Sequence, residues 1–331
     1  MAPEPALLAE VWRGDVLESV IRGHVAAVDA SGVLLACAGD PDHVTPGRST
    51  VKPLQALPFV RQAMDALGAP VAELAIACAS HEGEPRHVAT VRALLDRAGL
   101  TEDQLSCGPQ QPYSAAAARA LVEAGEPFGR IHNNCSGKHA AMLATCRVAG
   151  WPLTGYADSA HPMQRAVATG WREVAGIDVS EAPSGIDGCG LPTYGLPLRR
   201  LAAAFAGAAS SADSSFRRCQ EAMAAEPFLV GGSDRFDTAL LSAAGRLVTA
   251  KSGGAAVWCA VLRDEGVAVA VKLEAGHGEQ LPPVALAVLA GLGFPLGDAP
   301  SLQPFACPEL HNWAGMAVGE TRAVVRLQPR G

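Results

Sequence analysis

The chain has 331 residues, of which 49% are hydrophobic and 18% charged, so it is predicted to fold around a sizeable core. Its net charge of −7, the lack of a basic block and an aromatic content of only 5% argue against nucleic acid and against anionic membranes as partners. No apolar run approaches the length of about 18 residues that a membrane-spanning helix needs.

Both ends of the chain are predicted to form strands. Residues 24–28 and 33–37 flank the turn Asp29-Ala30-Ser31-Gly32, which is a hairpin signal. Further strands, rich in valine and alanine, are expected at residues 246–250, 256–262, 267–273 and 322–327. Few polar residues interrupt these runs, so both faces of the sheet are predicted to be covered.

The middle of the chain is predicted to be mostly helical, because apolar residues recur three and four positions apart. Helices are expected at residues 54–67, 85–100, 114–124, 136–148, 161–174 and 198–206. The predicted fold class is therefore α+β, with an antiparallel sheet built from both chain ends and a helical insertion. We expect a single domain, 1–331, with a sheet lobe of about 1–50 plus 245–331 and a helical lobe of about 51–244.

The cysteines and the first residues indicate a cytoplasmic location. The nine cysteines are scattered, and most lie in apolar runs, as Cys37, Cys78, Cys146 and Cys259 do. Free cysteines that pack as small hydrophobic residues are typical of the reducing cytosol. The first residues lack a basic segment followed by an apolar core, so no signal peptide is predicted.

The first candidate for chemistry is R-S-T-V-K-P at residues 48–53. Ser49 and Lys52 lie one helical turn apart, and Pro53 requires the helix to begin near Ser49. The positive end of the helix dipole favours an oxyanion at such a serine. The lysine can take its proton if burial or a second cation lowers its pKa from about 10.4. The alternative is a capping serine beside a solvated lysine, because S-x-x-K is a common pattern.

Two further segments contain the same residue types. Ser80 and His81 follow the apolar run 74–79, and the alternative there is a capping serine for the helix near Pro85. The segment K-S-G-G begins at Lys251 on the edge of a predicted strand, where glycines allow close approach to a ligand. The alternative is a strand-end lysine beside a turn. The order S-x-x-K, serine, K-[ST]-G is that of the serine penicillin-recognising enzymes.

The last candidate consists of two segments that contain loop cysteines. These are N-N-C-S-G-K-H at 133–139 and D-G-C-G at 187–190. The first lacks the upstream glycine of a phosphate loop, which argues against nucleotide binding. Cys135 at a helix start is expected to have a lowered pKa. Two such cysteines beside a histidine favour a soft metal such as zinc, and the alternative is two unligated thiols.

Together these motifs resemble the bacterial L-asparaginase II family, the class 3 or rhizobial-type asparaginases, over about residues 13–292. The resemblance is carried by R-S-T-V-K-P-L-Q-A at 48–56, A-S-H-E-G-E-P-R-H at 79–87, N-C-S-G-K-H-A-A-M-L at 134–143, S-G-I-D-G-C-G-L-P-T at 184–193 and the segment at Lys251. It implies a fold like the serine β-lactamases and glutaminases, and a homodimer is expected.

The resemblance also implies site residues. It implies two serine–lysine pairs, Ser49 with Lys52 and Ser80 with a lysine of the C-terminal sheet. It implies a zinc ion held by Cys135, Lys138 and Cys189. The substrate-binding residues expected from the matching segments are Arg48, His81, Asn134, His139 and Asp187.

Two segments depart from the family pattern. Residues 252–256 read S-G-G-A-A where we expect S-G-A-E-G, and residues 272–278 read K-L-E-A-G-H-G where we expect K-x-x-D-G. The second catalytic lysine is therefore either Lys251 or Lys272. We prefer Lys251, because its glycine neighbours match the penicillin-recognising pattern.

The predicted function is hydrolysis of a small-molecule substrate, L-asparagine, to aspartate and ammonia through a serine acyl-enzyme. Ser49 would attack with Lys52 as its base, while Ser80 and Lys251 would relay protons. A glutaminase or another amidase of the penicillin-recognising type is the enzymatic alternative, because one methylene group is worth only about 1–3 kcal/mol. A catalytically weak, metal-containing binding protein is the non-enzymatic alternative.

Overall fold

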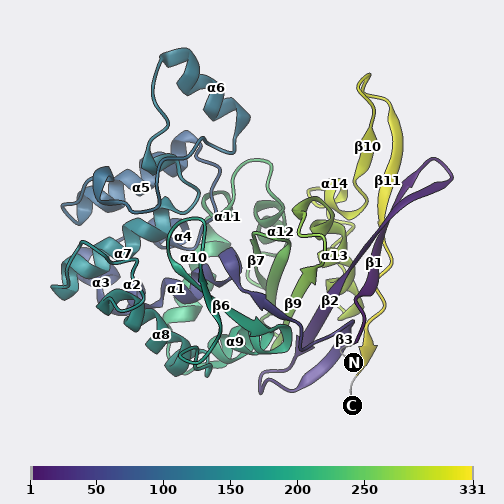
Figure 1. Cartoon of the computed structure of the whole chain (residues 1–331), viewed down its shortest axis with the longest axis horizontal. Helices are drawn as coiled ribbons and strands as arrows, with labels where there is room; N and C mark the ends of the chain where they lie inside the picture. The colour runs from purple at the N-terminus through teal and green to yellow at the C-terminus, as the bar shows by residue number, and fades with distance from the viewer. Residues whose placement is uncertain (1–2, 330–331) are drawn as a thin grey trace. The chain divides into compact units, whose positions relative to one another are not determined.

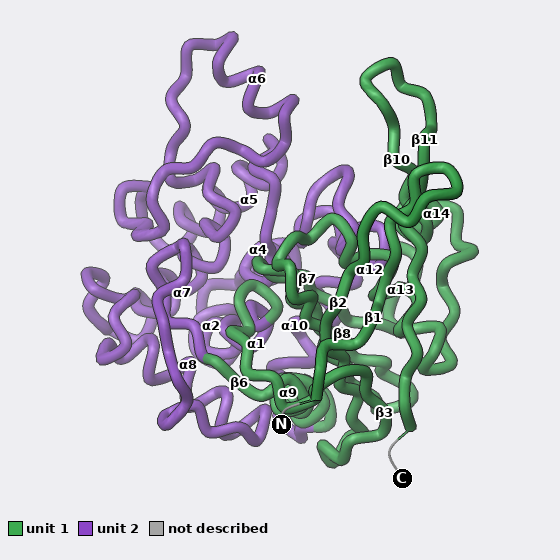
Figure 2. Tube along the Cα trace, turned by 45° about the vertical axis from the view of Figure 1, so that its right-hand side comes forward, with its two compact units in different colours: residues 1–50, 195–210, 242–331 green, residues 51–194, 211–241 purple. Residues whose placement is uncertain are grey.

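The computed structural model describes residues 3–329 and contains both helices and antiparallel strands, so the predicted α+β class is confirmed (Figure 1). The chain forms two compact units, which Figure 2 distinguishes by colour. The first unit comprises 1–50, 195–210 and 242–331, and the second comprises 51–194 and 211–241. Residues 195–210, which we expected in the helical lobe, therefore belong to the unit that contains the sheet.

The first unit is built on one antiparallel sheet of nine strands. Seven of them follow the order β10-β11-β1-β2-β9-β8-β7, and β3 pairs with both β2 and β12. Their bounds are β1 Ala6–Arg13, β2 Val16–Val28, β3 Leu34–Ala38, β7 Val248–Gly253, β8 Val257–Leu262, β9 Val267–Leu273, β10 Glu309–His311, β11 Ala317–Ala323 and β12 Gln328–Pro329. N-terminal β2 lies beside C-terminal β9, so the predicted sheet from both chain ends is confirmed.

Helices cover the centre of this sheet. Helix α9 (Leu198–Ser210) contacts β2, β8 and β9, and α13 (Leu281–Gly291) contacts β1, β8 and β11. Every residue of β8 is buried, so both faces of the sheet are covered there, as predicted. The short α14 (Gln303–Ala306) packs on α13, and β4 (Val44–Pro46) pairs with the last residues of β6 (Pro192–Pro197).

The predicted hairpin and several strands are found close to their expected positions. The side chain of Asp29 accepts hydrogen bonds from the backbone N–H groups of Ser31 and Val33, which closes the turn between β2 and β3. The strand expected at 322–327 is wrong in position, because β11 ends at Ala323. The strands β1, β10 and most of β11 were not predicted at all.

The second unit is mainly helical. Its helices are α1 Lys52–Gln55, α2 Leu57–Gln62, α3 Met64–Leu67, α4 Val71–Ala77, α5 Pro85–Arg97, α6 Ala115–Ala124, α7 Ser136–Ala149, α8 Pro162–Val174, α10 Ser215–Ala225, α11 Pro227–Val230 and the start of α12 Phe236–Ala244. Helix α7 is the central element, since it contacts α2, α4, α5 and α8 and is buried from Ser136 to Cys146.

The helix expected at 54–67 is broken into α1, α2 and α3. Pro58 lies in the first turn of α2 and has no backbone N–H to continue a helix from α1. The remaining predicted helices appear as α5 to α9 with shifts at their ends. None of the helices in the described part of the chain combines the length and the apolar character needed to cross a membrane.

Candidate active site

Lys52 and Ser80 form a buried hydrogen-bonded pair in the second unit. Lys52 is the first residue of α1 and is 0% exposed, and its Nζ lies 2.9 Å from Oγ of Ser80. The amine also donates to the backbone carbonyls of Ala79 and, at 3.3 Å, of Asn134. Because a carbonyl oxygen can only accept, these two contacts orient the amine with respect to Ser80.

The segment that carries Ser80 is held on both sides. The backbone N–H of Ser80 donates to the carbonyl of Val230 at 3.0 Å. His81 is fully buried: its Nδ1 accepts from the N–H of Gly83, and its Nε2 lies 2.9 Å from Oγ of Ser136 on α7. Burial first, and then nearby cations, hold the pKa of His81 well below its ordinary value. Both nitrogens of His81 are thus occupied within this unit, so the ring positions Ser80, and its expected contact with substrate stays a prediction.

Cys135, Lys138 and Cys189 converge in the second unit. All three are buried, and Nζ of Lys138 lies 3.3 Å from Sγ of Cys189. A hydrogen bond from Cys189, followed by the charges of Lys52 and Lys138, outweighs burial and holds the pKa of Cys135 well below 9.0. The same hydrogen bond and burial raise the pKa of Cys189. Of the two thiols, Cys135 is therefore the one that loses its proton more readily.

The neighbours of Lys138 keep its amine charged. Burial by itself would lower the pKa of Lys138, but negative charge at Cys135, Cys189 and Asp187 outweighs burial and raises it. Asp187 is half-buried, and its side chain accepts a hydrogen bond from the N–H of Gly188 at 2.8 Å. The backbone N–H of Asn134 donates to the side chain of Gln110 at 3.1 Å, which fixes the loop before Cys135.

His139 is oriented by two residues that the sequence did not indicate. Nδ1 of His139 lies 2.7 Å from the hydroxyl of Tyr156, which itself accepts from the N–H of Ser106 at 2.9 Å. Oγ of Ser106 also lies 3.3 Å from Nδ1, so two hydroxyl groups face this ring nitrogen. Nε2 of His139 is buried and has no hydrogen-bond partner among the described residues. A buried ring nitrogen of this kind requires a hydrogen-bond partner from water or from a ligand.

In the first unit, Arg48 and Ser49 lie in a 3₁₀ turn that ends at Val51. The end of β7 packs closely on this segment: a Cβ built on Gly253 would lie 3.2 Å from the backbone N of Ser49, and one on Gly254 would lie 3.2 Å from a guanidinium nitrogen of Arg48. The K-S-G-G segment and the R-S-T segment are thus neighbours, although about 200 residues separate them in the sequence.

The two lysines considered for the second catalytic role differ in their surroundings. Lys251 on β7 is 1% exposed, and its Nζ donates to the carbonyl of Ser252 at 3.0 Å. Lys272 on β9 is only half-buried, and its Nζ donates to the carbonyls of Ala255 and Leu273, each at 2.7 Å. Lys272 is therefore bonded to backbone at the turn after β7.

A cluster of His24, His43 and Glu274 lies beside Lys272. It is the only group of three His, Cys, Asp or Glu side chains, within residues 3–329, whose donor atoms all lie within 4.8 Å of one another. However, Nδ1 of His24 accepts from the N–H of Asp40 at 2.9 Å, so its proton is on Nε2, which faces Glu274 at 3.0 Å. A metal-bound histidine donates its second nitrogen instead, so this cluster is a hydrogen-bonded network.

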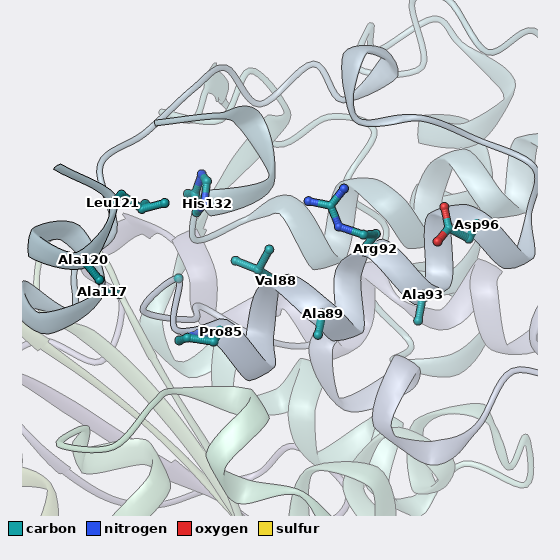
Figure 3. Close-up of a pocket in the computed structure, with 11 residues that line it drawn as sticks. Pro85, Val88, Ala89, Arg92, Ala93, Asp96, Ala117, Ala120, Leu121 and His132 are labelled. Carbon is teal, nitrogen blue, oxygen red and sulfur yellow. The ribbon is translucent and has the colours of Figure 1, made fainter. Parts of the chain in front are cut away.

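A separate pocket of about 550 Å³ lies between α5 and α6 (Figure 3). Its walls are mostly apolar, with Val88 and Leu121 among them, and Arg92, Asp96 and His132 add polar groups. None of the residues expected from the sequence to act in catalysis, substrate binding or metal binding lines it.

The fold and these clusters define a class: a mixed helix and sheet protein with a buried serine–lysine pair and a buried thiol–amine cluster in the same unit. The family model described as L-asparaginase II matches residues 9–323. The chain belongs to the L-asparaginase II family, and it is accordingly a hydrolase of the amidase type.

The other comparisons add little to this assignment. A search of the curated proteins finds no match to the chain. Among solved structures, a β-lactamase from Mycobacterium bovis is similar with 17% sequence identity, over 81% of this chain and 94% of that chain. The TM-score of this match is 0.40.

Proposed function

We propose that this protein hydrolyses the side-chain amide of L-asparagine to aspartate and ammonia through a serine acyl-enzyme. The observation that carries the proposal is the buried hydrogen bond between Lys52 and Ser80, 2.9 Å long, in a member of an amidase family. A lysine buried next to a serine hydroxyl is the arrangement that serine–lysine proton transfer requires.

In this mechanism Lys52 first loses its proton and then acts as the general base. Two of its N–H groups donate to the carbonyls of Ala79 and Asn134, and the hydroxyl of Ser80 is a further polar neighbour of this amine. Ser49 attacks the amide carbon and its proton passes to Lys52, while Ser80, bonded to that amine, relays protons to the leaving ammonia together with Lys251. Water then hydrolyses the acyl-enzyme with the same groups in reverse.

The developing oxyanion requires backbone N–H donors. The close packing of the Gly253 backbone on the N of Ser49 supports a donor pair from these two segments. The buried Nε2 of His139, which has no partner among the described residues, supports a substrate with a polar group, such as the carboxylate or amide of asparagine. Arg48 and Asp187 would bind the charged groups of the amino acid.

We also propose that the thiol–amine cluster holds zinc. The residues fit this ion, because two sulfurs and an amine converge in a buried position and two thiolates would balance its charge. Cys135, Cys189 and Lys138 would be the ligands, and Cys189 and Lys138 would have to release their protons. When bound, the ion would supply a fixed positive charge that orients the substrate.

The test is ammonia release from asparagine by the wild type and by Ser49→Ala, Ser80→Ala and Lys52→Met, with glutamine and a chromogenic β-lactam as competing substrates. Ser114→Ala is the matched control, since Ser114 caps α6 through a 3.3 Å bond to the N–H of Ala117. We expect the three site variants to lose turnover and the control to lose only about 0.5–2 kcal/mol of stability. Mass analysis of acid-quenched enzyme then locates the acyl group on Ser49 or Ser80. Normal ammonia release by Lys52→Met would exclude this mechanism.

A further inference from the structure

The backbone is strained where β7 meets the segment that contains Ser49. Apart from glycines, only three of the described residues have a left-handed backbone: Arg48, with a φ of 50°, Ala255, with 58°, and Ala256, with 53°. This conformation costs a residue with a Cβ about 1–2 kcal/mol. It persists only where the surrounding structure enforces it, and such residues gather at functional sites.

The three residues belong to one packed junction in the first unit. Gly253 and Gly254, which lead into the turn of Ala255 and Ala256, pack against Ser49 and Arg48, respectively. A shift of this turn would therefore move the backbone that lies against Ser49 and the guanidinium of Arg48. The turn is connected to both of the segments to which we assign the nucleophile and a substrate-binding group.

Lys272 is the side chain that holds this turn. Its Nζ donates to the carbonyl of Ala255 at 2.7 Å, while the N–H of Leu273 donates to the carbonyl of Ala256 at 3.1 Å. Lys272 itself is fixed in the centre of the sheet, where it pairs with Val257 on β8 and with His24 on β2. The second bond of its amine, to the carbonyl of Leu273, fixes the direction in which the amine points.

The composition of the chain adds an independent argument. Only four of its 26 basic residues are lysines: Lys52, Lys138, Lys251 and Lys272. The first three belong to the proposed active site and its metal cluster. A chain that otherwise uses arginine keeps lysine at the fourth position as well. A compact ammonium with rotatable donors can bond two backbone carbonyls from a half-buried position, whereas the planar guanidinium requires a different geometry.

We propose that Lys272 is a positioning residue of the active site: it holds the left-handed Ala255–Ala256 turn, and through that turn it keeps Arg48 and Ser49 in their reactive arrangement. This inference rests on the proposed function for its kinetic consequence but not for its structural one. It also assigns the two lysines different roles, with Lys251 acting in the chemistry and Lys272 acting on the backbone.

The experiment compares Lys272→Met with Val269→Ala, a control on the same strand whose side chain is fully buried away from the turn. We expect Lys272→Met to speed amide hydrogen exchange in peptides spanning 252–257 and 47–51. We also expect it to lower kcat about tenfold or more, with a smaller change in KM. Val269→Ala should lower the unfolding midpoint but leave exchange in these peptides and kcat unchanged.

Unchanged exchange in either peptide, or an equal loss of kcat in the control, would overturn the proposal. If the wild type proves unable to hydrolyse amides, the proposed function fails, and the exchange data alone decide the role of Lys272. Should Lys272→Met not fold, the same measurements are made with Ala255→Gly added to it. Glycine adopts the left-handed conformation without strain, so the double variant recovers the fold, yet its turn should still exchange fast.

Discussion

Replacing Gly137 by alanine tests whether the close approach of α7 to α4 sets the geometry of the second unit. A Cβ on Gly137 would lie 2.2 Å from the backbone carbonyl oxygen of Ile76, where real Cβ contacts are not shorter than 3.0 Å. The helices must therefore separate by at least 3.0 − 2.2 = 0.8 Å at this point. Backbone on both sides prevents any relief by a rotamer change.

The consequence extends to both clusters of the unit. Helix α4 leads into the segment of Ser80, and α7 begins beside Cys135 and carries Lys138 and His139. We expect Gly137→Ala to cost about 3 kcal/mol, the upper end of the usual range for overpacking. A displacement near 1 Å at reacting groups can cost about 100-fold in rate, so activity should fall further than the loss of stability explains.

Urea unfolding and ammonia release measure these two effects. Gly185→Ala is the matched control, because nothing lies within 4 Å of a Cβ built there and Gly185 does not have a positive φ. The control should behave as the wild type in both assays. An unfolding midpoint of Gly137→Ala equal to that of the wild type would refute the reasoning.

Three more predictions follow from the site. Tyr156→Phe removes the hydroxyl that orients His139 and accepts from the N–H of Ser106. It should lower the free energy of unfolding in urea by about 1–3 kcal/mol and raise KM. An unchanged KM would contradict the role of His139. Fresh, reduced protein should contain about one zinc per chain by elemental analysis. The variant Cys189→Ala should lose this zinc and should raise KM more than it lowers kcat. If metal-free protein binds substrate normally but has no turnover, the role assigned to the zinc is wrong. In protein freed of metal by a chelator, the pKa of Cys135 is lower in the folded state than in the unfolded state, so this thiol contributes to the free energy of unfolding. The contribution is complete above the ordinary pKa of 9.0 and is lost as the pH falls through the pKa of the folded state. Cys135→Ala should remove this pH dependence of urea unfolding, and an identical slope in both proteins would count against a thiolate there.

Elements with a strong local pattern could be predicted from the order of the residues. The helices α5 to α8 and the strands β8 and β9 appear near their expected positions, because a 3.6-residue or continuous apolar pattern reports which faces are buried. The pattern fails in β1 and β11, because many of their residues are only partly buried and their apolar and polar residues alternate weakly. It also fails at 54–67, where Pro58 interrupts a run that is otherwise helical in spacing.

The candidate residues were recognisable because each motif is short and contiguous, but their partners were not. Local spacing suggested that Ser49 and Lys52 form a pair, whereas the hydrogen bond in the second unit joins Lys52 to Ser80, 28 residues further along the chain. Tyr156 and Ser106, which orient His139, carry no pattern of their own, since a single hydroxyl leaves no periodic trace in a sequence.

Tertiary packing also decided which unit each segment joined. Residues 198–210 have an ordinary helical pattern, yet α9 packs on β2, β8 and β9 because those strands offer it an apolar face. The convergence of Cys135 and Cys189, and the contact of Lys272 with the turn at Ala255, likewise join segments that are distant along the chain or lie on different strands. Side-chain type and spacing determine which chemistry is available, whereas contacts between distant segments depend on the packing of whole helices and strands, and no local periodicity encodes that packing.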